Sequence, residues 1–452
     1  MRKPKIELTE EIKAATKRDD LDIVTMERSY RLITPLYGGG VKTGKVDRVT
    51  PVSGKAVRGN LRFWWRAVRG GQFGDSLKSM KAKEDEIWGT AVPAKKEKSE
   101  EKPTKLPPKV NLHVYDSEIG DEFVVYRAIP NPRRQGRTQI KQFHRDKVPA
   151  YAAFPQRPEE GSPPGTTSEP LFANVTFKLK LIYFMEHQKE LDAALWAWET
   201  FGGVGARSRR GFGALSCEKI VINGEEQDSP LIPKDTLENW LANQLEHYQE
   251  DTHFHDDIPH LPSDFKTQLK IVSTSPFEKA EQAWIHLIEA LQQFRHKRPI
   301  RLDERGRPKP TRNKWPEPDA IRTKVSPRNR RYPAYYDPEI LKYPRAEFGL
   351  PIIFELRGEG GIPKSTLRGK DHNRMGSPLI LRPYQCANQQ FVGLALILAG
   401  PRLPPSDLIL EGIDDEAVQS RLLPDEAAQI ATRDNNIYDG NVDILQSFID
   451  SL

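Results

Sequence analysis

The chain has 452 residues, of which 37% are hydrophobic and 29% are charged, and its net charge is +6. This composition supplies enough apolar material for real cores and permits, without requiring, a polyanionic partner. The two cysteines, Cys217 and Cys386, exclude a disulfide scaffold and a four-cysteine zinc module. The longest apolar run, 391–399, is too short to cross a bilayer, and residues 1–20 lack the apolar region of a signal peptide. We therefore expect a soluble cytoplasmic protein.

Charge is distributed unevenly along the chain. Residues 127–147 hold seven basic residues and one acidic residue, and residues 295–331 hold fourteen basic and four acidic residues. From 401 to the end there are three basic and eleven acidic residues. A run of charge is usually a solvated surface, so these segments indicate candidate contact regions and do not identify a partner.

The predicted elements form two series. The first contains a strand at 22–34, a helix at 54–69, a strand at 173–184, a helix at 188–201, a strand at 214–222 and a helix at 234–249. The second contains a strand at 265–273, a helix at 277–295 and strands at 350–357, 378–382 and 391–398. Stretches rich in Pro, Gly or Lys at 91–109, 155–170 and 299–333 are predicted loops. Both series favour an α+β fold of two domains on similar βαββαβ plans.

Residues 31–69 combine a glycine-rich turn at 38–40 with a basic helix whose predicted N-cap is Ser53. Apolar residues repeat at helical spacing at Val57, Leu61, Trp64 and Val68. A second row follows one residue later, at Arg58, Arg62, Trp65 and Arg69. We expect Trp64 in the core. A solvated basic edge is the alternative for the arginines. Because the twelve residues 58–69 contain no acid to pair them, we favour phosphate binding by Arg58, Arg62, Arg66 and Arg69.

A second motif, FGGVGARSRRGFG at 201–213, follows a predicted helix and precedes a strand. Its glycines let consecutive backbone N–H groups approach one anion, and its arginines add charge. It has neither the Walker A spacing nor the dinucleotide-binding spacing, so ATP and NAD are not expected. The pattern indicates a single-stranded nucleic-acid backbone bound by Gly203, Gly205, Arg207, Arg209, Arg210 and Gly211. A flexible connection would explain the glycines but not the arginines.

Histidines offer little support for catalysis. His253, His255 and Asp257 give H-x-H-x-D, but the next position is Ile258, where a dinuclear metal motif needs a histidine. No Ser/His/Asp or Cys/His arrangement can be argued from the sequence. We therefore expect no metal, no cofactor and no catalytic residue.

Five stretches together resemble the RAMP family of CRISPR proteins. They are TPLYGGG (34–40), RGNLRFWWRA (58–67), IWGTA (87–91), GVGARSRRGFGAL (203–215) and RMGSPL (374–379). More narrowly, they resemble the first Cmr subunit of the type III-B effector complex. The resemblance covers 24–91, 173–222 and 347–400. Insertions at about 91–170 and 299–345 and the acidic tail lie outside it.

This resemblance implies two ferredoxin-like, RRM-type domains, which we place at 1–233 and 263–452 with a linker helix and loop at 234–262. It also implies a non-catalytic cap at the 3′ side of a CRISPR RNA, beside the sixth and fourth Cmr subunits, that helps capture single-stranded target RNA. The family's basic residues correspond to Arg58, Arg62, Arg66, Arg207, Arg209 and Arg210.

Two other hypotheses stay open. One is a RAMP-fold endoribonuclease that processes CRISPR RNA precursors with a histidine general base. Neither basic motif contains a histidine, and the nearest in sequence is His187. The other is a basic scaffold protein that does not contact RNA.

Overall fold

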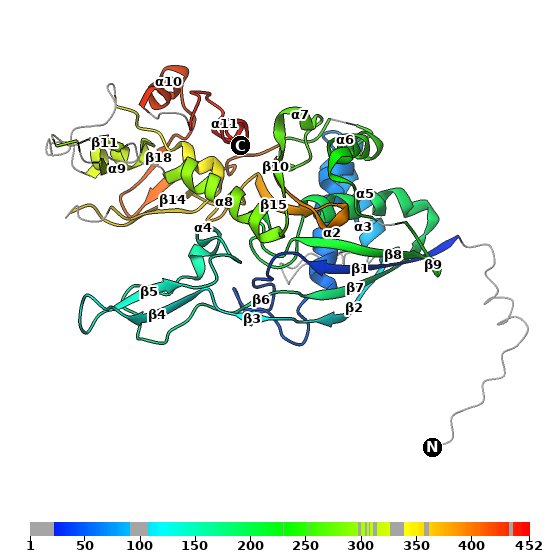
Figure 1. Ribbon diagram of the computed structural model, residues 1–452. Helices are drawn as coiled ribbons and strands as arrows, with labels where there is room; N and C mark the ends of the chain where they lie inside the picture. The colour runs from blue at the N-terminus through cyan, green and yellow to red at the C-terminus, as the bar shows by residue number, and fades with distance from the viewer. Residues whose placement is uncertain are drawn as a thin grey trace, which may run out of the picture.

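Three sheets of three or more strands organise the described part of the chain (Figure 1). The computed structural model describes residues 22–90, 107–228, 230–251, 253–296, 300–302, 305–306, 308–310, 314–325, 339–356, 361–433 and 437–452. Within these ranges no helix is long and apolar enough to cross a membrane.

The first sheet has the strand order β2-β7-β1-β8-β9, and every neighbouring pair is antiparallel. Its elements are β1 (Ile23–Leu32), α2 (Gly54–Arg69), β2 (Asn111–Glu118), β7 (Thr176–Phe184), α5 (Gln188–Phe201), β8 (Leu215–Ile222) and β9 (Glu225–Glu226). Side chains of β1 alternate between buried and partly exposed, as a strand with one face on a core requires. The predicted strands at 22–34, 173–184 and 214–222 and the helices at 54–69 and 188–201 are confirmed.

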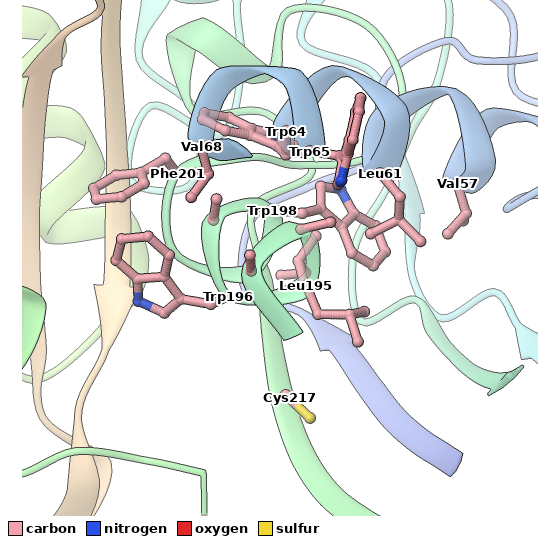
Figure 2. Packing of buried hydrophobic residues seen from close by; sticks show 14 of the residues in the cluster. Val57, Leu61, Trp64, Trp65, Val68, Leu195, Trp196, Trp198, Phe201 and Cys217 are labelled. Carbon is pink, nitrogen blue, oxygen red and sulfur yellow. The ribbon is translucent and has the colours of Figure 1, made fainter. Parts of the chain in front are cut away.

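The first core lies where α2 and α5 pack against each other (Figure 2). Ser53 caps α2, because its Oγ accepts a hydrogen bond from the amide of Ala56 at 3.2 Å. Figure 2 shows the predicted apolar row of α2 facing Leu195, Trp198 and Phe201 of α5. Trp64 is buried, as expected. Trp65, placed in the basic row by its spacing, is also fully buried.

The segment predicted as an insertion at 91–170 contributes the edge strand β2 to this sheet. Its polar residues alternate weakly, because an edge strand buries only part of one face. The segment also contains β3 (Glu122–Phe123), β4 (Tyr126–Pro130), β5 (Thr138–Gln142) and the short helix α4 (Ala150–Ala153), and β6 (Leu171–Phe172) follows it. Strands β4 and β5 form a hairpin that extends away from the first sheet (Figure 1). Residues 91–106, most of the first predicted loop, lie outside the described residues.

Two further helices pack on the first core: α3 (Leu77–Trp88) and α6 (Leu237–Tyr248). The predicted helix at 234–249 is confirmed as α6, preceded by a 3-10 turn at Lys234–Thr236. Leu237, Leu241 and Leu245 belong to the first core, so the helix of the predicted linker packs against α2 and α5, and the domain boundaries stay a prediction.

The second sheet has the order β10-β16-β15, also antiparallel. Its elements are α7 (Phe265–Gln268), β10 (Leu269–Phe277), α8 (Ala280–His296), β15 (Leu379–Gln385) and β16 (Phe391–Ile397). All residues of β15 and β16 are buried, because one face covers the first core and the other covers α8. The predicted strand at 265–273 begins late, since Asp264 caps a helical turn by accepting from the amide of Lys266 at 2.9 Å. In the described residues no fourth strand pairs with β10.

A third, four-stranded sheet was not predicted as a unit. Its order is β13-β14-β17-β18, formed by β13 (Ile352–Phe354), β14 (Ser365–Gly369), β17 (Leu408–Glu411) and β18 (Asp414–Val418). The predicted loop at 299–333 includes β11 (Ile300–Leu302), β12 (Pro308–Pro310) and α9 (Glu317–Val325). The acidic tail is structured as well, with α10 (Pro424–Arg433) and α11 (Ile444–Asp450). Apolar residues of α9 and α11 are buried in the hydrophobic cores. In the sequence, the high density of charged residues hides the spacing of these apolar residues.

Candidate nucleic-acid interface

The glycine-rich loop joins α5 to β8 and lies against the loop that follows β1. The amide of Ala206 donates to the carbonyl oxygen of Tyr37 at 2.7 Å, and the amide of Gly213 donates to that of Pro35 at 3.0 Å. The two glycine-rich stretches, predicted separately, are therefore side by side.

The predicted glycines mainly allow close packing within the protein. Gly205 has φ +79°, and a Cβ there would lie 2.6 Å from the carbonyl oxygen of Tyr37. A Cβ on Gly203 would lie 2.9 Å from the carbonyl oxygen of Gly213, and one on Gly211 would overlap the indole of Trp284. Gly203 and Gly211 are buried, whereas Gly205 is partly exposed. Of the three, Gly205 is therefore the one placed to contact a ligand.

Arg207 forms no ion pair with a carboxylate of the described residues. The residue has left-handed backbone angles at the start of the 3-10 turn η4 (Ser208–Arg210). Its Nε is buried and makes no hydrogen bond. Burial lowers the pKa of Arg207, and the nearby Tyr37 and Tyr151 oppose this effect. A half-buried guanidinium of this kind is suited to bind an anion.

Arg209 and Arg210 are engaged with the second sheet. Arg209 Nη1 donates to the carbonyl oxygen of Ser377 at 2.5 Å. Arg210 donates from Nη1 to the carbonyl oxygen of Leu379 and from Nη2 to that of Phe348, both at 2.9 Å. Burial lowers the pKa of Arg210 to about 9. These two arginines therefore connect the glycine-rich loop to the RMGSPL stretch, so in this structure they have an intramolecular role.

Arg382 makes the reciprocal connection and was missed in the sequence. From β15, its Nη1 donates to the carbonyl oxygens of Glu199 at 2.8 Å and Gly202 at 2.7 Å, and its Nη2 donates to that of Leu215 at 2.8 Å. The side chain is fully buried, and burial lowers its pKa to about 10. The sequence did contain a signal for this role: Arg382 is the single charged residue in an otherwise apolar predicted strand. A charge in such a place needs a buried hydrogen-bond partner.

Three of the four α2 arginines are paired with acidic residues, so the expectation that no acid pairs them is wrong. Arg62 contacts Glu84 of α3 at 2.9 Å, and Arg66 contacts the same carboxylate. Arg69 contacts Glu190 of α5 at 3.0 Å and is buried. The acids come from neighbouring helices, which inspection of α2 alone could not reveal.

Arg58 differs from the other α2 arginines. Its side chain is partly exposed, its Nε is buried without a hydrogen bond, and no ion pair to it is found in the described ranges. Among the four, Arg58 therefore retains the most capacity for a phosphate.

The β4–β5 hairpin and the residues directly after it carry a separate basic surface. All seven basic residues of 127–147 are exposed: Arg127, Arg133, Arg134, Arg137, Lys141, Arg145 and Lys147. Figure 1 shows the hairpin standing away from the three sheets. The sequence showed that residues 127–147 are basic, but it did not predict that a β-hairpin would expose these side chains.

The histidines give no metal site in the part of the chain that the structure describes, where no group of three His, Cys, Asp or Glu could hold an ion. His253 lies 3.3 Å from Asp75, and His255 Nδ1 accepts from the amide of Asp257 at 3.1 Å. His187 is buried, and burial lowers its pKa.

Residues 29–216 match the RAMP superfamily. This segment contains the end of β1, α2, the first sheet through the start of β8 and the glycine-rich loop, so these elements resemble those of RAMP superfamily proteins. About two fifths of the chain is similar in sequence to Cmr1 subunits of the CRISPR Cmr system.

Two curated relatives come from Pyrococcus furiosus. The CRISPR system Cmr subunit Cmr1-2 is 24% identical over 42% of this chain and 92% of its own length. Subunit Cmr1-1 is 27% identical over 39% of this chain and 42% of its own length.

Solved structures are similar at lower identity. The apo crystal structure of Cmr1 from Pyrococcus furiosus is 16% identical, with a TM-score of 0.40, over 86% of this chain and 94% of that chain. A chain of the type III-B Cmr-β complex bound to cognate target RNA is 12% identical, with a TM-score of 0.46, over 83% and 94%. At these TM-scores the likeness is loose, and the resemblance to RAMP and Cmr1 proteins rests on the sequence matches.

Proposed function

We propose that the protein is a non-catalytic, Cmr1-like subunit of a cytoplasmic type III-B CRISPR complex. It binds the 3′ region of the CRISPR RNA, helps capture single-stranded target RNA and contacts the sixth and fourth Cmr subunits. The carrying observation is the pair of apposed glycine-rich loops beside Arg207, whose Nε makes no hydrogen bond to any described residue. The similarity to Cmr1 supports the assembly.

We further propose that the chain contains two ferredoxin-like units. In favour of the first, its helices and strands follow the order βαββαβ and pair as β2-β7-β1-β8. In favour of the second, β10, α8, β15 and β16 follow the first half of the same plan and pair as β10-β16-β15. Domain boundaries near 233 and 263 would shift, because α6 belongs to the first core.

Within the predicted RNA-binding set, the geometry favours direct contact by Arg207, Gly205 and Arg58. Arg62, Arg66 and Arg69 are paired with carboxylates, and Arg209 and Arg210 bond backbone carbonyls. We propose that these five arginines hold the binding surface in shape, and that the exposed basic hairpin extends it.

The test is single-stranded RNA binding by Arg207→Ala and Arg58→Ala. Each variant should weaken binding about equally for unrelated sequences, because phosphate contacts carry no base information. Each lost contact should also flatten the log–log salt dependence by about 0.7. Lys78→Ala, an exposed charge on α3, is the matched control. Unchanged affinity and salt slope in both folded variants would contradict the proposed surface.

The endoribonuclease alternative has its own test. Purified alone, the chain should not cleave RNA with or without divalent metal. Specific cutting that persists through purification and is abolished by His187→Ala would overturn the non-catalytic assignment.

A further inference from the structure

An exposed phenylalanine lies at the end of the short helix α4, in the predicted insertion. The helix continues directly into the 3-10 turn η2 (Phe154–Gln156). The side chain of Phe154 is 60% exposed, and every other Phe, Tyr and Trp in the part of the chain that the structure describes is buried or partly buried. The face of this ring is therefore available to another molecule.

The turn that carries Phe154 is held in place on its other side. Ala152 and Ala153 are buried in the core that also contains residues of α8, and Figure 1 shows α4 next to α8, against which it packs. The hydroxyl of Tyr126 on β4 donates to the carbonyl oxygen of Ala150 at 2.9 Å. The phenylalanine is thus presented by an anchored turn and not by a free loop.

Tyr151 enlarges the aromatic surface. It precedes Phe154 by three residues, and Phe154 has right-handed helical backbone angles, so the two side chains share one face of the turn. Tyr151 is partly exposed, and its hydroxyl lies 3.1 Å from Nε2 of His296.

Arg295, in the last turn of α8, lies between two aromatic rings. Its Cζ is 5.8 Å from the ring centroid of Tyr151 and 5.3 Å from that of Phe348. The side chain is partly exposed, and its guanidinium makes neither a hydrogen bond nor an ion pair with the described residues. Burial lowers the pKa of Arg295, and Tyr151 opposes this effect. A bound anion would favour the charged form further.

The turn η4 brings Arg207 to the same region. At the end of this turn, Arg210 donates to the carbonyl oxygen of Phe348, the residue whose ring Arg295 contacts. Tyr151 is close enough to raise the pKa of both Arg207 and Arg295 against the effect of burial. Two guanidiniums that lack carboxylate partners among the described residues therefore lie beside the exposed aromatic face.

We propose that one nucleotide of single-stranded RNA binds here, with its base stacked on Phe154 and Tyr151 and its phosphate held by Arg207 and Arg295. Every base has a face that can stack on an aromatic ring, and a guanidinium fork pairs with phosphate oxygens. An apolar segment of a partner protein would cover the ring but leave both guanidiniums unpaired. The inference rests on the proposed function, to which it adds a base contact and a second phosphate contact.

The first experiment compares two oligonucleotides by fluorescence anisotropy with the full chain: an octamer of uridylate and an abasic octamer, which keeps the phosphates and lacks the bases. Phe154→Ala should weaken binding of the uridylate octamer about five- to a hundredfold, the range for one lost stacking contact. Its binding of the abasic octamer and its salt slope should not change. Ile353→Ala removes an apolar side chain that is also 60% exposed, so it is the matched control and should bind both octamers normally.

Arg295→Ala provides the complementary measurement. It should weaken binding of both octamers and flatten the log–log salt dependence by about 0.7, because it removes a phosphate contact. Phe154→Trp keeps an aromatic ring and should retain the affinity of the unmodified chain for the uridylate octamer. The melting temperature of Phe154→Ala should stay unchanged, because the ring is largely in solvent.

Normal binding of both octamers by Phe154→Ala would overturn the proposal and assign the exposed ring to a protein contact. The proposed function can survive that result, since Arg207→Ala and Arg58→Ala would still weaken RNA binding. If the unmodified chain binds neither octamer, the nucleotide site and the proposed function are both wrong.

Discussion

The guanidinium of Arg382 donates a hydrogen bond to the carbonyl oxygen of Gly202, joining a strand of the second sheet to the first residue after α5. The helix end is thereby satisfied by a side chain from about 180 residues further along the chain. The position of the glycine-rich loop consequently depends on the second sheet.

Replacing Arg382 with Met should lower the free energy of unfolding by about 2–4 kcal/mol. The buried carbonyls of Glu199, Gly202 and Leu215 lose their donor, and removal of a buried charge offsets only part of that cost. Urea unfolding measures the change, with the exposed Arg421→Met as the control, expected within about 0.5 kcal/mol. A loss as small as the control's would mean that the bonds do not stabilise the fold.

Gly205→Ala should destabilise the protein more than Gly136→Ala. Both glycines have positive φ, +79° and +75°, so both substitutions strain the backbone. A Cβ at 205 also meets the carbonyl oxygen of Tyr37, whereas none of the described atoms lies within 4 Å of one at 136. The excess should be about 1–3 kcal/mol in unfolding measurements. Equal losses of stability in the two variants would show that the loop containing Tyr37 can move to accommodate the added Cβ at little cost.

Neutralising Arg133, Arg134 and Arg137 on the hairpin should weaken RNA binding and leave the melting temperature unchanged. Their side chains are exposed, so removing their charge affects few contacts within the fold. If all three bind phosphates, the salt slope should fall by about two. A matched triple variant at the exposed Lys78, Lys266 and Lys370 should retain the wild-type slope. If both triple variants weaken RNA binding equally, the hairpin arginines contribute only through the net charge of the protein and make no specific phosphate contacts.

The protein should become less stable as the pH falls from 7.5 to 5.5. Burial lowers the pKa of His187 and of His260 from the usual 6.5, so the unfolded chain binds protons at these sites before the folded chain does. The contribution of these two neutral histidines to the free energy of unfolding is therefore fully present above pH 6.5 and decreases as the pH falls below it. His187→Gln should reduce the drop in melting temperature. The exposed His372→Gln should not, and an equal reduction in both would exclude burial as the cause.

Local periodicity predicted most elements that lie directly on a core. The helix at 188–201 matches α5, because a run of apolar residues between polar ends leaves few alternatives. Edge strand β2 was missed, since its half-exposed residues alternate weakly. The helix α9 and the strands of the acidic segment were missed because charge and proline obscured short apolar patterns.

The site was harder to predict than the fold, because the partners of its charged side chains lie far away in the sequence. Spacing placed Arg62 on a basic row, but its partner Glu84 lies 22 residues away on another helix. Arg210 and Leu379 are separated by 169 residues. Sequence can therefore indicate which residues carry charge, whereas only the assembled fold reveals which charges are already in use.

The complete burial of β15 and β16 has a practical consequence for dividing the gene. Their inner face contributes Ile380, Leu394 and Leu396 to the same core as α2 and α5. A fragment ending near residue 262 would expose the apolar surface that these side chains cover, and the complementary fragment would expose the side chains themselves. Insolubility of such halves would therefore report this shared surface and reveal nothing about which half recognises a ligand.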